Sequence, residues 1–224
     1  SSQRSGLYVL DKAVTVADTA GVKVNDYVLL NGAAFATVDG VTAVTADGTN
    51  DNVGTNVTAV GLVQDLRGAF TWAIWVYPTT RSTYQDLFVQ GDGRDGGGTG
   101  HYLSISSSSG YIQVVGPNGR YKLSVAAVPL NEWSLIVYSK TSNASLTRDE
   151  LIYINNAATS FTGGVGDPDN PTDSSSKTII GSIKYTDSYY RGTKSIAEVF
   201  VYETVLSTSQ MTALWDDTRA KYGK

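Results

Sequence analysis

Short β-prone runs separated by turn residues follow one another from Phe70 to Tyr202. No long amphipathic helical pattern interrupts them, which excludes βαβ architectures and favours two stacked antiparallel sheets. The expected strands cover residues 70–77, 84–89, 102–106, 111–115, 121–125, 133–138, 151–154, 177–180 and 195–202. The pattern therefore predicts an all-β sandwich.

The first 62 residues differ in texture from the rest of the chain. They are rich in Val, Ala, Thr and Asp, and they carry turn signals such as Asn31-Gly32, Asp39-Gly40 and Asp47-Gly48. Short β-prone runs lie between these turns, at residues 13–16, 27–30 and 41–44. We therefore divide the chain into residues 1–62, which form either a small β-rich extension or the first strands of the sandwich, and residues 63–224, the main sandwich.

One helix is expected, close to the C-terminal end of the sequence. Ser207 is followed three residues later by Gln210, which is the pattern of a capping box. Met211, Leu214 and Trp215 then follow at helical spacing and give one apolar stripe. The sequence predicts a short capped helix that packs on the sandwich.

Composition and charge exclude several classes of partner. The 224 residues carry a formal charge of −4 and no concentration of Lys or Arg, so nucleic acid and anionic membranes are not expected partners. The chain has no cysteine, which excludes disulfides and thiolate metal sites. No apolar run reaches the roughly 18 residues of a membrane span, and the first residues lack a signal-peptide core.

Three segments carry a family pattern when they are taken in order. The first is Gly68–Pro78, the second combines Asn131–Tyr138 with Leu151–Asn155, and the third runs from Ile180-Gly181 through Tyr190-Arg191-Gly192 and Ile196–Tyr202 to Val205-Leu206-Ser207. Together they resemble the laminin-G-like branch of the concanavalin A-like lectin/glucanase superfamily over about residues 65–218. Asn156 and Ala197 depart from the pattern, since the family usually has Gly and Asp there.

The resemblance implies a concanavalin A-like jelly roll of two antiparallel sheets. It does not fix an activity, because the superfamily includes lectins, adhesion modules, glycoside hydrolases and structural surface proteins. The candidate sites must therefore decide the function.

The sequence offers little for catalysis. Retaining glycosidases need two carboxylates about 5 to 5.5 Å apart, and none of the four glutamates is spaced to pair with another acid on one strand face. These glutamates are Glu132, Glu150, Glu198 and Glu203. The single histidine, His101, has no nucleophile signature nearby. We expect a non-enzyme with no catalytic residues.

Two aspartate-rich stretches are candidates for calcium, the one cofactor that the sequence suggests. Asp92 and Asp95 lie in a Gly-rich stretch, and Asp167 and Asp169 lie in a Pro-containing one. Calcium prefers six to eight oxygen ligands, which loops of this kind can supply. Aspartate is also a common turn former, so a purely structural role remains the alternative.

Aromatic residues give the candidate ligand contacts. In the strand from Phe70 to Tyr77 only one face can point at the core, so Trp75 and Tyr77 lie on an outer surface unless another element covers them. Tyr185, Tyr189, Tyr190 and Arg191 form a second group in an expected loop. Aromatic faces beside polar groups suit glycan binding, whereas packing is the alternative.

We expect a non-catalytic module, extracellular or on a virion surface, that binds a glycan or a host-surface polysaccharide. A structural virion protein, such as a phage capsid decoration, head fibre or tail component, is the alternative. Residues 14–28 are similar to a segment of phage structural proteins, and such a protein would bind other proteins of the particle.

Overall fold

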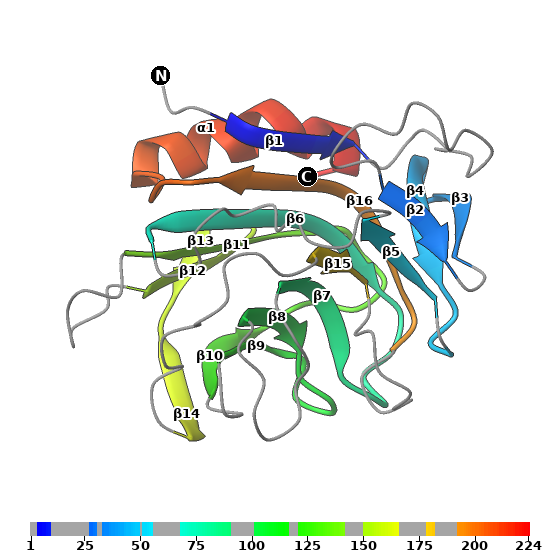
Figure 1. Cartoon of the computed structure of the whole chain (residues 1–224), viewed down its shortest axis with the longest axis horizontal. Helices are drawn as coiled ribbons and strands as arrows, with labels where there is room; N and C mark the ends of the chain where they lie inside the picture. The colour runs from blue at the N-terminus through cyan, green and yellow to red at the C-terminus, as the bar shows by residue number, and fades with distance from the viewer. Residues whose placement is uncertain are drawn as a thin grey trace.

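A computed structural model gives the fold of the chain. It describes residues 4–9, 27–30, 33–49, 51–55, 68–90, 101–116, 121–141, 150–165, 178–181 and 192–224. The described residues form two antiparallel sheets stacked on each other, with a short C-terminal helix on the outside of one of them (Figure 1). The fold class predicted from the strand pattern is confirmed.

Sheet A is the layer beneath the C-terminal helix (Figure 1). Its strands run in the order β13 (Ala157–Thr159), β12 (Glu150–Ile154), β11 (Ser134–Lys140), β6 (Phe70–Pro78), β16 (Lys194–Tyr202), β4 (Val41–Ala46) and β3 (Ala34–Val38). β1 (Arg4–Val9) also pairs with β16.

Sheet B is the opposite layer, and it carries the central strands of the middle of the chain. Its order is β14 (Phe161–Val165), β10 (Tyr121–Ala127), β9 (Tyr111–Val115), β8 (His101–Ile105), β7 (Gln85–Gln90), β15 (Thr178–Ile180), β5 (Asn52–Thr55) and β2 (Tyr27–Leu30).

Strands from the first 62 residues belong to both sheets. β1, β3 and β4 lie in sheet A, whereas β2 and β5 lie in sheet B. Two of them share one edge of β16: β4 pairs with Lys194–Ile196, and β1 pairs with Glu198–Tyr202. Of the two alternatives for residues 1–62, the described strands correspond to strands of the sandwich. The expected run at residues 13–16 lies outside the described residues.

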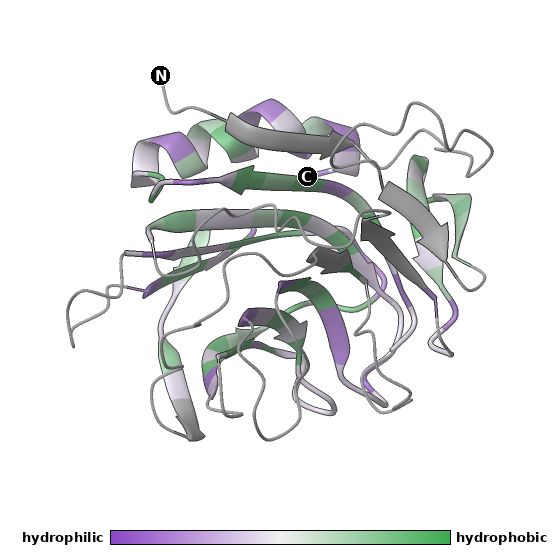
Figure 2. Ribbon diagram, viewed as in Figure 1, coloured by the Kyte–Doolittle hydropathy of each residue, from purple (hydrophilic) through white to green (hydrophobic). Residues whose placement is uncertain are grey.

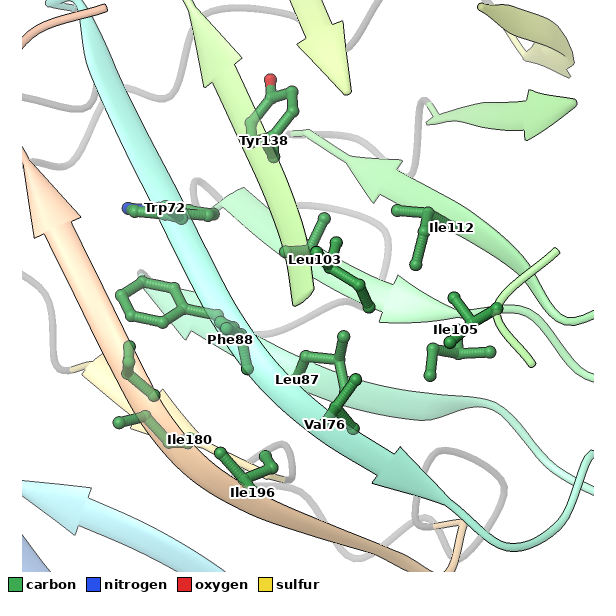
Figure 3. Close-up of a cluster of buried hydrophobic side chains, with 14 of the residues drawn as sticks. Trp72, Val76, Leu87, Phe88, Leu103, Ile105, Ile112, Tyr138, Ile180 and Ile196 are labelled. Carbon is green, nitrogen blue, oxygen red and sulfur yellow. The ribbon is translucent and has the colours of Figure 1, made fainter. Parts of the chain in front are cut away.

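The main core lies between the sheets, where alternate side chains of each strand meet. β6 contributes Phe70, Trp72, Ile74 and Val76, all fully buried. Sheet B supplies Leu87, Phe88, Leu103, Ile105, Ile112 and Val114 (Figure 3). The packed rings of Trp72 and Phe88, with centroids 4.2 Å apart, join the two layers.

A second apolar cluster lies on the outer face of sheet A, under the C-terminal segment. Helix α1 (Thr208–Thr218) and the 3₁₀ helix η3 (Arg219–Tyr222) cover it. Figure 2 shows α1 with mixed hydrophobic and hydrophilic residues, and Met211 and Leu214 are its buried positions. Ser207 and Gln210 form both bonds of the predicted capping box.

Among the residues described, no helix has both the length and the apolar character needed to span a bilayer.

Candidate functional site

Trp75 lies under the C-terminal segment rather than on an outer surface. Its side chain is 0% exposed and stacks on Tyr222, with ring centroids 3.9 Å apart and planes 14° apart. Trp215 stacks at 5.6 Å, and the Trp75 Nε1 donates to Thr218 Oγ1 at 3.1 Å. The expectation of an exposed Trp75 is therefore wrong, because a helix fills the space over this face of the sheet.

Tyr77 lies at the rim of the same cluster. It is half-buried, and its ring contacts Trp133 edge-on with centroids 5.5 Å apart. Trp133 in turn contacts Tyr222. Tyr77 thus keeps some exposed surface, but its ring is committed to packing at the border of the helix.

Tyrosines gather instead on the outer face of sheet B. Leu103 and Ile105 of β8 face the core, so Tyr102 and Ser104 point outward. The same alternation turns one tyrosine outward on each of four neighbouring strands or just before it. We call these residues the tyrosine face: Tyr84 next to β7, Tyr102 on β8, Tyr111 on β9 and Tyr121 on β10.

The strand register arranges this face in two rows. The apolar row crosses β7, β8, β9 and β10 as Val89, Tyr102, Val115 and Tyr121. The polar row beside it contains Asp86, Ser104 and Gln113. The Ser104 hydroxyl donates to Asp86 Oδ1 at 2.6 Å. The polar row, Val89, Tyr102 and Val115 are buried, whereas Tyr84, Tyr111 and Tyr121 are half-buried.

The strand ends show where the aspartate-rich stretches attach. Gln90 and His101, which flank residues 91–100, are register partners, and Thr178 also pairs with Gln90. Val165 pairs with Tyr121 at the same end of the sheet. Residues 91–100 and 166–177 therefore both join strands at the end of sheet B that carries the apolar row. Asp92, Asp95, Asp167 and Asp169 themselves lie outside the described residues.

The predicted aromatic loop attaches along β7. Gly181 donates its N–H to Leu87 O at 3.1 Å, and Gly192 donates to Tyr84 O at 2.9 Å. Residues 182–191 thus leave and rejoin the described fold beside the tyrosine face. Tyr185, Tyr189, Tyr190 and Arg191 lie outside the described residues.

His101 points into the core between the sheets, where it begins a polar network. Its Nε2 lies 3.0 Å from the Tyr138 hydroxyl, and Tyr138 donates to Glu150 Oε1 at 3.1 Å. Lys122 Nζ is 2.9 Å from the other oxygen of Glu150. His101 is 0% exposed, so its place is structural.

The glutamates are engaged in ion pairs rather than in a shared site. Glu150 pairs with Lys122 between the sheets, Glu198 with Lys221 at 2.6 Å under the C-terminal segment, and Glu132 with Lys224 at 3.1 Å. Glu203 is exposed after β16. Within the part of the chain that the structure describes, no group of three or more His, Asp or Glu residues is placed to hold a metal ion.

Sequence reasoning missed the tyrosine face. Tyr102, Tyr111 and Tyr121 each stand at or next to the start of a predicted strand, and strand parity could have placed them on one face. The sequence does not say which face of a strand points inward when both carry apolar residues, as Val89, Tyr102 and Val115 show here.

Solved structures with the same fold include binding domains and a multidomain enzyme. Domain 4 of AbnA, a GH43 extracellular arabinanase from Geobacillus stearothermophilus, solved with arabinotriose, matches with a TM-score of 0.63 and 17% identity over 95% of this chain and 98% of that one. The binding domain of botulinum neurotoxin serotype D matches at 0.60 and 15%, over 94% and 51% of the two chains. A Trypanosoma rangeli sialidase matches at 0.59 and 11%, over 85% and 29%.

These likenesses establish the fold alone. The chain spans about half the length of the neurotoxin domains that it matches. No curated protein matches the chain in sequence. A family model, however, matches residues 47–212, which is well over half of the chain. The chain therefore belongs to the Laminin_G_3 family of the concanavalin A-like lectin/glucanases superfamily.

Proposed function

We propose that the chain is a non-catalytic glycan-binding module, exposed outside the cell or on a virion surface, and that it binds through the tyrosine face. The observation that carries this proposal is the segregation of tyrosine on sheet B. Four neighbouring strands each place a tyrosine on the outer face, whereas Leu103, Ile105, Ile112 and Val114 fill the inner face.

Tyrosine rings suit this function because they combine an apolar face with a hydroxyl. The apolar face packs against the C–H groups of a sugar, and neighbouring polar groups bind its hydroxyls. Gln113, Ser104 and Asp86 form such a polar row beside the tyrosines. The half-buried Tyr121 and Tyr111 offer the first contact surface, on the β9–β10 side of the sheet.

The engagement of the glutamates supports the non-catalytic part of the proposal. A retaining hydrolase would use two carboxylates facing one sugar. Here Glu150 is held between the sheets, and Glu198 lies under the C-terminal segment on the outside of sheet A. These two carboxylates therefore lie on different sides of sheet A.

Names of similar structures agree with this proposal. One solved domain was obtained in complex with arabinotriose, and others are named as receptor-binding domains. The aromatic group Tyr185, Tyr189, Tyr190 and Arg191 stays a predicted ligand contact, attached beside the same face. The virion interpretation rests on residues 14–28, which lie outside the described residues, and it stays a prediction.

Glycan arrays that include arabinotriose, followed by titration calorimetry, test the proposal. Tyr121→Ala should weaken binding at least several-fold while the fold is retained, since base-like stacking of a ring on an aromatic side chain is worth on the order of 1 kcal/mol. Tyr77→Ala is the matched control, because it removes a half-buried tyrosine from the other sheet.

Two results would contradict the proposal. Absence of binding to every glycan would remove the function. Loss of binding in Tyr77→Ala, with Tyr121→Ala unchanged, would move the site to the outer face of sheet A.

A further inference from the structure

Lys194 is a charged side chain buried at the start of β16. It is only 2% exposed, and its ammonium donates to Gly192 O at 3.1 Å. A buried ammonium is costly unless oxygens replace the water that it has lost. The surroundings of Lys194 supply such oxygens from three separate parts of the chain.

The first oxygens come from carboxylates. Asp86 on β7 and Asp51 just before β5 both act on the Lys194 ammonium through their negative charges. Asp51 is 6% exposed; its Oδ2 accepts the N–H of Asp47 at 2.9 Å. Its other oxygen, Oδ1, is buried and has no hydrogen-bond partner within the described structure. One carboxylate oxygen near the ammonium is thus left for electrostatic contact alone.

Gln85 adds a neutral oxygen to the same region. Its amide nitrogen donates to Thr80 O, while its Oε1 is buried without a hydrogen-bond partner among the residues described. Gln85 packs so closely on Gly192, whose carbonyl binds Lys194, that a Cβ on Gly192 would collide with it. The oxygens of β7, of the turn before β5 and of the segment before β16 therefore converge on one place.

The backbone fixes this convergence. Lys194 is the register partner of Ala46, the last residue of β4, so Asp51 follows a few residues later on the adjoining turn. Thr193 Oγ1 donates to Asp47 O at 3.2 Å and ties this turn to β16. Gly192 N–H donates to Tyr84 O and ties the same segment to β7. A pocket with these walls has a rigid frame.

We propose that these oxygens form a cation pocket that the chain fills with its own Lys194 ammonium. Two carboxylates, an amide oxygen and a backbone carbonyl are the donors that a small hard cation prefers. The expected ligands are therefore ammonium or potassium when the lysine side chain is shortened. In the natural chain the tethered ammonium occupies the pocket and joins β16, β7 and the β4–β5 turn.

Chemical rescue of Lys194→Ala tests the proposal at pH 7. The variant should have a lower Tm than the natural chain, and about 0.1 M ammonium or potassium chloride should restore a large part of the loss. Tetramethylammonium chloride at the same concentration supplies equal ionic strength but is too large for the pocket, so it should restore none. Monovalent ions are used because calcium would also report on the aspartate-rich stretches.

Two variants serve as controls. Lys194→Met fills the space with an apolar chain, so ammonium should not raise its Tm. The double variant Lys194→Ala with Asp51→Asn lacks one carboxylate and should respond less than Lys194→Ala. Equal rescue by tetramethylammonium, or none by any cation, overturns the proposal.

A measurement on the folded natural chain covers the case in which Lys194→Ala does not fold. Nitrogen-detected NMR of the lysine side chains reports the pKa of Lys194 directly. Asp51→Asn should lower this pKa further, whereas Asp216→Asn on the far side of the molecule should leave it unchanged. An unchanged value in Asp51→Asn would remove Asp51 from the pocket and overturn the proposal.

Discussion

Trp75 and Tyr102 show how neighbouring context decides the role of an outward-facing aromatic residue. Both alternate with core residues along a central strand, and both are nearly inaccessible. Trp75 is covered by rings of the C-terminal segment, whereas Tyr102 belongs to a row that ends at the half-buried Tyr121. Strand parity predicts that these side chains point outward. It does not predict what lies on top of them, because that depends on contacts distant in sequence.

The pKa of Lys194 gives a pH dependence that can be measured. Burial lowers this pKa from 10.5 to about 8, against the opposing charges of Asp86 and Asp51. Between these two values the unfolded chain binds more protons than the folded one, so the free energy of unfolding rises with pH. Full deprotonation corresponds to about 3 kcal/mol, at about 1.4 kcal/mol per pKa unit.

Chemical denaturation between about pH 7.5 and 9.5 should show this rise in the natural chain, and Lys194→Met should lack it. The upper limit avoids tyrosine ionisation, since burial, together with the charge of Glu198, raises the pKa of Tyr222 and adds an opposite trend above about pH 10. The same slope in both proteins would show that Lys194 is not the titrating group.

At the scale of elements, the C-terminal helix is the clearest case in which local sequence determined the structure. Ser207 accepts from Gln210 N–H at 3.3 Å, and Gln210 Oε1 accepts from Ser207 N–H at 2.8 Å. Both bonds lie within four residues, so they are readable from the sequence. The contact with Trp75 spans 143 positions to Thr218 and is not.

Removal of the helix cap should weaken the cover over Trp75. Ser207→Ala is expected to lower the free energy of unfolding by about 1 kcal/mol, which corresponds to a fall in Tm of about 2–4 °C for a chain of this size. Ser209→Ala is the control, because it deletes a neighbouring exposed hydroxyl without removing a bond to a backbone N–H. Differential scanning calorimetry separates the two, and equal shifts would argue against the capping role.

Strand positions were predictable where a strand has its own apolar pattern. All nine strands expected after residue 69 are present with small shifts at their ends, and β2 and β4 fall on runs expected in the first 62 residues. β13 and β14 were not expected. Both are edge strands with small or polar residues, and pairing with β12 and β10 rather than their own composition stabilises them.

At the scale of the whole molecule, the two outer faces of the sandwich differ. The outer face of sheet A is an apolar cluster closed by α1 and η3. The outer face of sheet B carries the tyrosine face, next to strand ends from which residues 91–100 and 166–177 depart. This asymmetry leaves sheet B as the side on which we expect ligands, and it explains why the candidate residues could not be ranked from the sequence. Their value depends on which sheet the helix covers.

Calcium is the last prediction that this arrangement makes testable. The strands β7, β8, β14 and β15 meet at one end of sheet B, so a calcium ion bound by Asp92, Asp95, Asp167 or Asp169 would connect two stretches that are far apart in sequence. At a hundred times its Kd, such an ion should stabilise the fold by about 2.7 kcal/mol. We expect a higher Tm in calcium than in chelator, and a smaller difference in Asp92→Ala and Asp167→Ala. Asp216→Ala, which removes an exposed acid from α1, should respond like the natural chain. If calcium and chelator give the same Tm in the natural chain, the aspartates act as turn residues and the metal leaves the account.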